Sequence, residues 1–244
     1  MGAVLRERAA AVARATAGVL LVSWRYLWAV TPLHRSARRG DASDLPPPLP
    51  EELIDERSQP WREGTGPLFH RLFSVDVEGA TMSAEGLVAL LAADLGGSVP
   101  AEVTTVEAVR TAGGELRPGD EVVVRLPGPW DGPVRVVRRT PTSLHLATLA
   151  GHLEAGQIEF RARPPRDGRP LRFEVEVWAR PANRIVDLLY TRLRMAKEVQ
   201  LNMWVRFCLT TARRAGGRAR CGVTISTRVL DQPTPVQGPH RPCP

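Results

Sequence analysis

Seven segments of the chain alternate apolar and polar residues, which is the pattern of strands with one buried face. The segments are 69–79, 102–111, 120–126, 133–140, 143–150, 156–163 and 171–180. Short breaks rich in Gly, Pro and Asp, the composition of hairpin turns, separate the last six. The pattern therefore predicts an antiparallel meander with one apolar face that another element must cover.

Two further segments repeat apolar residues every three or four positions, which predicts helices. The first begins after Ser83, a good capping residue, and runs to about Leu95, where two glycines follow. The second begins after Pro181, extends over roughly 30 residues and ends before Gly216. We expect an α+β arrangement in which a curved sheet of about seven strands wraps this long C-terminal helix. A cavity for an apolar ligand can remain between the two layers.

The remaining regions have less regular patterns. Residues 1–30 are typical of an amphipathic helix, and residues 31–60 are typical of a Pro-rich linker, with DLPPPLP in its middle. The main domain then spans residues 61–217. Residues 218–244 lack a periodic apolar pattern, so we expect a disordered tail there.

Charge is distributed unevenly along the chain. Residues 1–40 carry a net charge of +6 and residues 180–220 a net charge of +8, whereas residues 41–179 carry −8. Basic ends can attract nucleic acid or an anionic membrane, or they can pair with the acidic middle. We do not expect nucleic acid binding, because no zinc knuckle or pair of stacking aromatic residues accompanies the charge. Lys197 is the single lysine among 33 basic residues, a bias typical of GC-rich genomes such as those of actinobacteria.

The N-terminal helix carries the residues of a membrane-surface anchor. Trp24, Tyr26 and Trp28 lie close together, and Arg14 and Arg25 enclose only ten uncharged residues. Such a stretch is too short to span a bilayer, which takes about 20 residues. We therefore expect either a helix lying on an anionic membrane surface through residues 1–40, or a helix packed on its own domain.

The cysteines favour a reducing compartment. Cys208, Cys221 and Cys243 are odd in number, and none has the spacing of a metal-ligand pair. We expect Cys208 to lie in the core. We therefore predict a cytoplasmic protein that is peripheral to the membrane if its N-terminal helix binds there, with no metal and no cofactor.

Four short segments carry a family resemblance: 66–69 (GPLF), 125–128 (RLPG), 148–160 (TLAGHLEAGQIEF) and 177–181 (VWARP). With them the chain resembles a bacterial and plant family, domain of unknown function nineteen-ninety, within the helix-grip (START-like, SRPBCC) superfamily. Ala150 and Leu153 stand where that family usually has prolines. The resemblance implies a helix-grip fold, shared with polyketide cyclases and birch-pollen-allergen-like proteins. It implies no particular reaction.

His152 and Glu154 are the candidate catalytic residues. They lie two apart between Gly151 and Gly156, at the junction of two strand patterns. A structural turn is the favoured interpretation, because glycines permit positive φ angles and Glu154 can accept backbone hydrogen bonds. The alternative is an acid–base pair in which His152 is the general base and Glu154 orients it. A metal site is disfavoured, since the segment supplies at most two ligands.

The second predicted helix carries the candidate ligand-binding residues, for which ordinary core packing is the alternative. They are Arg192, Met195, Met203, Trp204 and Phe207. Our first hypothesis is a protein that binds a small hydrophobic ligand between sheet and helix. The alternatives are a cyclase- or hydrolase-like enzyme using His152 and Glu154, or a scaffold peripheral to the membrane.

Overall fold

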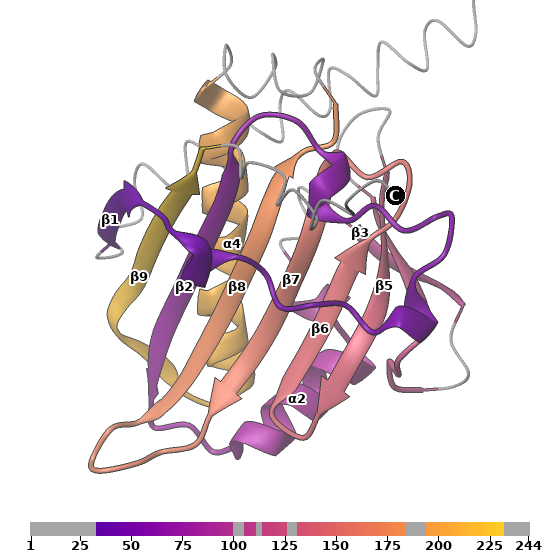
Figure 1. Ribbon diagram of the computed structural model, residues 1–244. Coiled ribbons are helices and arrows are strands. Elements are labelled where there is room, and N and C mark those ends of the chain that lie inside the picture. The colour runs from indigo at the N-terminus through magenta and orange to yellow at the C-terminus, as the bar shows by residue number, and fades with distance from the viewer. Residues whose placement is uncertain (1–32, 100–104, 111–113, 126–130, 184–193, 232–244) are drawn as a thin grey trace, which may run out of the picture.

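The computed structural model describes residues 33–99, 105–110, 114–125, 131–183 and 194–231, which form one sheet with helices behind it (Figure 1). The strands are β1 Leu33–Arg39, β2 Leu68–Glu78, β3 Thr105–Arg110, β4 Glu121–Arg125, β5 Asp131–Thr140, β6 Ser143–Thr148, β7 Glu154–Arg163, β8 Leu171–Pro181 and β9 Arg218–Leu230. Their order is β1-β9-β2-β8-β7-β6-β5-β4-β3. The sheet is mixed, because β1 runs parallel to β9 while the other neighbours are antiparallel. All seven predicted strands are present, and the α+β class is confirmed.

Two α-helices of the described residues lie on one face of the sheet, behind the strands in Figure 1. Helix α2 spans Ala84–Ala93 and begins as predicted, with Ser83 Oγ accepting the N–H of Gly86 at 3.1 Å. Helix α4 spans Arg194–Arg214, and the first part of the predicted helix, 184–193, lies outside the described residues. The expectation that this helix is the C-terminal element is wrong, because β9 follows it. Among the described residues, no helix has the length and apolar composition needed to cross a membrane.

The core lies between this face of the sheet, the inner face, and the two helices. Alternation along each strand places every second side chain there. Its buried members include Phe73, Val75, Leu87, Leu91, Leu146, Phe160, Phe173, Val175, Val205, Phe207 and Cys208. Burial raises the pKa of the Cys208 thiol, in keeping with its predicted place in the core.

Strand β9 corrects the prediction of a disordered tail from residue 218. It lies between β1 and β2, with Val223 opposite Val75 and Ile225 opposite Phe73 in the inner layer. Val223, Ile225 and Val229 alternate with the polar Thr224, Ser226 and Arg228, so this segment does carry the two-residue period of a strand with one buried face. A break in register after Val75 accommodates Cys221, whose φ is 58°. Residues 232–244 lie outside the described part of the chain.

The predicted linker also belongs to the domain. Residues 33–39 form β1, and residues 40–67, here called the strap, cross the face of the sheet opposite the helices (Figure 1). We call that face the outer face. The strap includes three short 3₁₀ turns, η1 Ala42–Asp44, η2 Glu51–Leu53 and η3 Trp61–Glu63, and a fourth turn, η4 Gly96–Ser98, follows α2. Proline-rich composition thus predicted the extended backbone of the strap but not its contacts.

Buried and exposed charges hold the strap to the sheet. Arg135 of β5 donates to Asp55 of the strap at 2.8 Å and to Glu121 of β4 at 2.7 Å. It also donates to the carbonyl oxygen of Leu53 at 3.0 Å. Arg57 of the strap adds a second bond to Glu121 at 2.6 Å. The hydrogen bond from Arg135 lowers the pKa of Asp55 from 3.8 to about 2.

This ion pair predicts acid-sensitive attachment of the strap. Because the folded state depresses the pKa of Asp55, its contribution to stability is complete above pH 3.8 and is lost as pH falls through about 2. In urea unfolding at a series of pH values, Asp55→Asn should be less stable than the wild type at neutral pH. The difference should vanish near pH 2.

The control for this prediction is Asp167→Asn, in a turn where the side chain is 84% exposed. It should follow the wild type throughout the pH series. A deficit of Asp55→Asn that stays constant from neutral pH to pH 2 would contradict an ionic attachment.

Candidate functional site

His152 and Glu154 lie where β6 passes into β7. The backbone N–H of Glu154 donates to Nδ1 of His152 at 2.9 Å. The other edge of the imidazole lies against Gly132 of β5, where an added Cβ would stand 3.2 Å from Nε2. Burial lowers the pKa of His152, which favours the neutral ring that this hydrogen bond requires. Nδ1 is therefore occupied as an acceptor within the turn.

The strap clamps the same turn. Gln59 donates its side-chain amide to the carbonyl oxygens of His152 at 3.0 Å and of Glu154 at 2.8 Å. Thr148 Oγ1 donates to the carbonyl oxygen of Gln59 at 2.8 Å and accepts the N–H of Gly156 at 2.9 Å. These bonds are those of a structural junction, and they support the turn interpretation over an acid–base pair.

The backbone geometry explains why two positions of the turn are glycine and why one is alanine and not proline. Gly151 has a φ of 98°, a conformation that other residues rarely adopt. A Cβ at Gly156 would overlap the carbonyl oxygen of Trp178. Ala150 donates its N–H to the carbonyl oxygen of Arg57 at 2.6 Å, a bond that a proline at this position could not make.

A metal site gains no support at this turn or elsewhere in the described ranges. No group of three or more His, Cys, Asp or Glu side chains there is arranged to hold a metal ion.

The candidate ligand residues divide into three groups. Phe207 is 1% exposed and packs on Phe160 and Phe173, with ring centroids 5.1 and 6.2 Å apart, so it is a core residue. Trp204 and Met203 are half-buried. The ring of Trp204 lies beside that of Phe160, with ring centroids 6.0 Å apart. Arg192 and the side chain of Met195 lie outside the described residues.

Sequence reasoning missed a polar cluster on the outer face. The ring nitrogens of His70 lie 3.1 Å from Asp44 Oδ1 and 2.8 Å from Glu176 Oε1. Its ring stacks on Trp178 with centroids 5.2 Å apart. Because both nitrogens face carboxylates, the protonated ring can donate to both. Alternation along β2 places His70 on this face, but nothing in the sequence indicates that Asp44 covers it.

His145 is a second histidine of this face, and it is buried. It is 2% exposed, and burial lowers its pKa to about 4, so the ring is neutral at physiological pH. Its Nε2 has no hydrogen-bond partner among the described residues, and neither has the indole Nε1 of the neighbouring Trp178. A bound water is the ordinary partner for such atoms.

Comparison with known proteins identifies a family. The family model of DUF1990, described as a domain of unknown function, matches residues 100–228, more than half of the chain. This is the family that the sequence motifs resemble. No curated protein matches the chain in sequence.

Three solved structures illustrate the structural similarity. The Zhui aromatase/cyclase from Streptomyces sp. R1128 is 18% identical, with 61% of this chain and 94% of that chain covered and a TM-score of 0.42. The hypothetical protein jhp0584 from Helicobacter pylori is 11% identical, with 59% and 87% covered and a TM-score of 0.43. The di-domain ARO/CYC StfQ from the steffimycin biosynthetic pathway is 13% identical, with 64% and 53% covered and a TM-score of 0.41. Similarity at this level says nothing of ligand or reaction.

The turn predicts a structural role for His152 that stability measurements can detect. His152→Ala leaves the buried N–H of Glu154 without its acceptor, which should lower the free energy of unfolding by about 1–3 kcal/mol. The matched variant His34→Ala, on the exposed strand β1, should stay within about 0.5 kcal/mol of the wild type. Equal stability of the two variants in urea unfolding would show that the turn does not depend on the imidazole.

Proposed function

Because the chain belongs to the DUF1990 family, whose description assigns no activity, we propose its function from its own geometry: it is a helix-grip protein that binds a small hydrophobic molecule between the sheet and α4. One observation carries the proposal. Trp204 is half-buried in the middle of α4, although its neighbours Val205 and Phe207 are each 1% exposed. Part of this indole is therefore accessible at the border of the apolar layer between helix and sheet.

The sheet side of this layer also has an apolar side chain that is only half-buried. Ile158 of β7 projects toward α4 beside the buried Phe160, yet it is only half-buried. Phe160 itself contacts the ring of Trp204. Apolar side chains from both layers thus border one place at which a ligand could complete the packing.

A polar group accompanies this apolar surface. The indole Nε1 of Trp204 is buried and has no hydrogen-bond partner within the described ranges. A ligand with a carbonyl or ether oxygen at one end would supply the missing acceptor. Micromolar affinity corresponds to about 8 kcal/mol, which at 25 cal/mol per Å² requires more than about 300 Å² of buried apolar area. The ligand is therefore expected to be a fused-ring or long-chain compound rather than a small solvent-sized molecule.

The enzyme alternative receives less support from the described residues. It requires His152 to reach a reactant, and Nδ1 of His152 is engaged by the backbone while its ring rests on Gly132. No observation among those residues favours a cyclase- or hydrolase-like reaction over simple binding.

A filling substitution tests the site. Ile158→Trp should fill the space that we propose for the ligand and weaken binding of the neutral probe N-phenyl-1-naphthylamine by about 10-fold, because the added ring takes the ligand's place. Ile54→Trp makes the same change at a strap residue that is 48% exposed, and it should bind the probe as the wild type does. Fluorescence titration of the full chain measures both affinities.

Native mass spectrometry of the full chain purified from its own host provides the direct test. A bound apolar compound that is absent from Ile158→Trp is expected. An unmodified mass, together with equal probe affinity in both variants and the wild type, would overturn the proposed function.

We also propose that residues 1–40 bring the cytoplasmic protein to an anionic membrane surface. The support is the net charge of +6 and the cluster of Trp24, Tyr26 and Trp28. Residues 1–32 lie outside the described part of the chain, and residues 33–39 are strand β1, so the proposed contact rests on the segment before β1.

Liposome co-sedimentation of the full chain tests this attachment. Binding to vesicles with anionic lipid should exceed binding to zwitterionic vesicles and should weaken with added salt, because each arginine near the surface contributes at most about 1 kcal/mol. A variant in which four arginines are changed to glutamine should lose most of its binding to anionic vesicles. The four are Arg6, Arg8, Arg14 and Arg25. Equal sedimentation of this variant and the wild type would remove the membrane from the account.

A further inference from the structure

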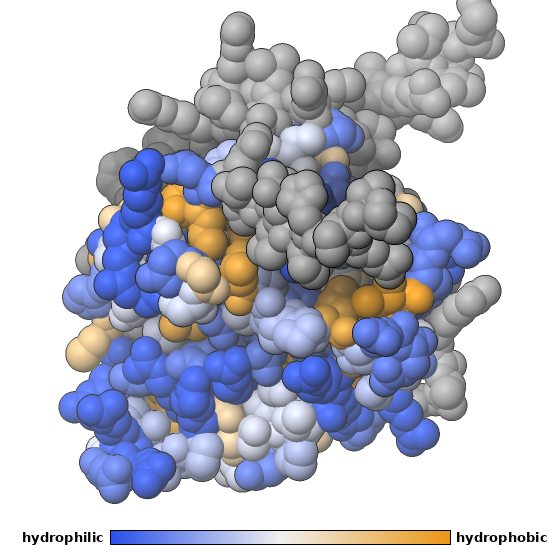
Figure 2. All heavy atoms as spheres, viewed as in Figure 1, coloured by the Kyte–Doolittle hydropathy of each residue, from blue (hydrophilic) through white to orange (hydrophobic). Residues whose placement is uncertain are grey.

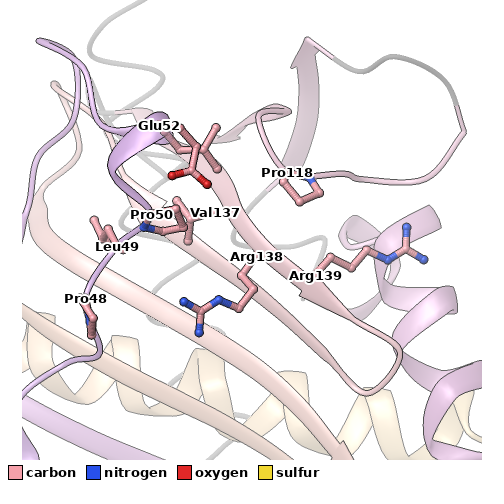
Figure 3. Close-up of a pocket in the computed structure, with 9 residues that line it drawn as sticks. Pro48, Leu49, Pro50, Glu52, Pro118, Val137, Arg138 and Arg139 are labelled. Atoms are coloured by element: carbon pink, nitrogen blue, oxygen red, sulfur yellow. The ribbon is translucent and has the colours of Figure 1, made fainter.

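A cavity of about 480 Å³ lies on the outer face, between the strap and β5 (Figure 3). Its walls combine apolar and charged residues: Pro48, Leu49, Pro50, Leu53, Pro118 and Val137 with Glu52, Arg138 and Arg139. Figure 2, which views the same face, shows an apolar area on the β5 side surrounded by hydrophilic residues. The volume lies within the range of about 300–1,000 Å³ typical of small-molecule sites.

The strap is fixed on both sides of this cavity. Gln157 donates to the carbonyl oxygen of Pro47 at 2.8 Å, and Arg135 donates to that of Leu53 at 3.0 Å. Both donor side chains are buried in the sheet. Pro48 and Pro50 lie between these two attachments and have fixed φ angles. The wall is therefore formed before any ligand binds, which lowers the entropic cost of binding.

The two arginines at the cavity differ in whether another group already pairs with them. Arg139 donates to the carbonyl oxygen of Leu116 at 2.9 Å and to Glu115 at 2.6 Å, so its charge is already paired. Arg138 is exposed and has no hydrogen-bond or ion-pair partner among the residues that the structure describes. Figure 3 shows Arg138 beneath Leu49 and Pro50, while Arg139 points to the other side.

Among the charged lining residues, Arg139 is paired with Glu115, so Glu52 and Arg138 carry the charges that remain. The guanidinium of Arg138 is therefore the group at this cavity that is available to an anionic ligand. A planar guanidinium binds a carboxylate through two parallel hydrogen bonds, and proline rings with Val137 offer flat apolar surfaces for a ring.

We propose that this cavity binds a small aryl carboxylate. Its carboxylate pairs with Arg138, and its ring lies between Pro50 and Val137. The site is separate from the one proposed between the sheet and α4, because the two lie on opposite faces of the sheet. The proposal therefore stands or falls independently of that function.

Titration of the full-length protein with benzoate, followed in ¹H–¹⁵N spectra, tests the proposal. We expect saturable shifts of the amide resonances of Leu53, Val137 and Arg138. Benzyl alcohol, which keeps the ring and lacks the charge, should bind at least about 10-fold more weakly, because charge-assisted hydrogen bonds are roughly twice as strong as neutral ones. Acetate, which keeps the charge and lacks the ring, should also bind more weakly.

Variants locate the charge that matters. Arg138→Gln should weaken benzoate binding by about 10-fold, whereas Arg166→Gln, in an exposed turn, should leave it unchanged. If Arg138→Gln bound benzoate with the same affinity as the wild type, the proposal would be overturned. So would the absence of saturable shifts, or saturable shifts confined to residues around Trp204.

Discussion

The outer face depends on the buried guanidinium of Arg135. This group joins β5 to Glu121 of β4, and it holds two points of the strap, Asp55 and the carbonyl oxygen of Leu53. Breaking a buried ion pair by removing one partner costs about 3–5 kcal/mol, since the other charge is left in a poorly solvated place. Without this cation, the part of the strap that forms one wall of the cavity loses its attachments at Leu53 and Asp55, although Gln157 and Gln59 still hold the strap elsewhere.

The two faces of the sheet are therefore stabilised by different physics. The inner face is covered by apolar burial against α2 and α4. The outer face is covered by hydrogen bonds and ion pairs, among them Arg161 with Glu174 and Glu176. The uneven charge of the sequence is also resolved in part by ion pairs between distant segments, because Arg214 at the end of α4 pairs with Asp94 at the end of α2 and Arg218 pairs with Glu78. These exposed pairs contribute little stability individually, and they reduce the charge available to an outside partner.

Local sequence patterns were sufficient to predict the strands of the meander and the start of one helix. Alternation predicted the strands of the meander, and the capping Ser83 predicted the start of α2. The strap was not predicted because its structure depends on partners far away in sequence and not on its own periodicity. Strand β9 was not predicted because its alternating segment, 223–229, is short and is followed by a polar, proline-rich stretch. The prolines in residues 31–60 indicated an extended linker, but they carry no information about the contacts that the strap makes with the sheet.

The candidate site was predictable to a similar extent. Glycines around His152 indicated a turn, and the hydrogen bonds agree with that interpretation. That Phe207 is core while Trp204 is half-buried depends on the register of α4 against Phe160, which the helical period does not specify. The cavity beside Arg138 could not be foreseen, since one wall comes from a segment with no recognisable pattern.

The position of β9 also governs when the sheet can be completed during synthesis. Strand β1 pairs only with β9 among the described strands, and β9 pairs with it across about 190 residues of chain. Strand β1 can therefore pair only after β9, made about 190 residues later, has left the ribosome. Until then β2 presents an open edge, the kind of surface at which nascent chains pair wrongly with one another. The pairing of β9 with β2 and β1 is therefore a late step in the folding of this sheet, and the edge of β2 needs protection from the time β8 pairs with it until β9 is made.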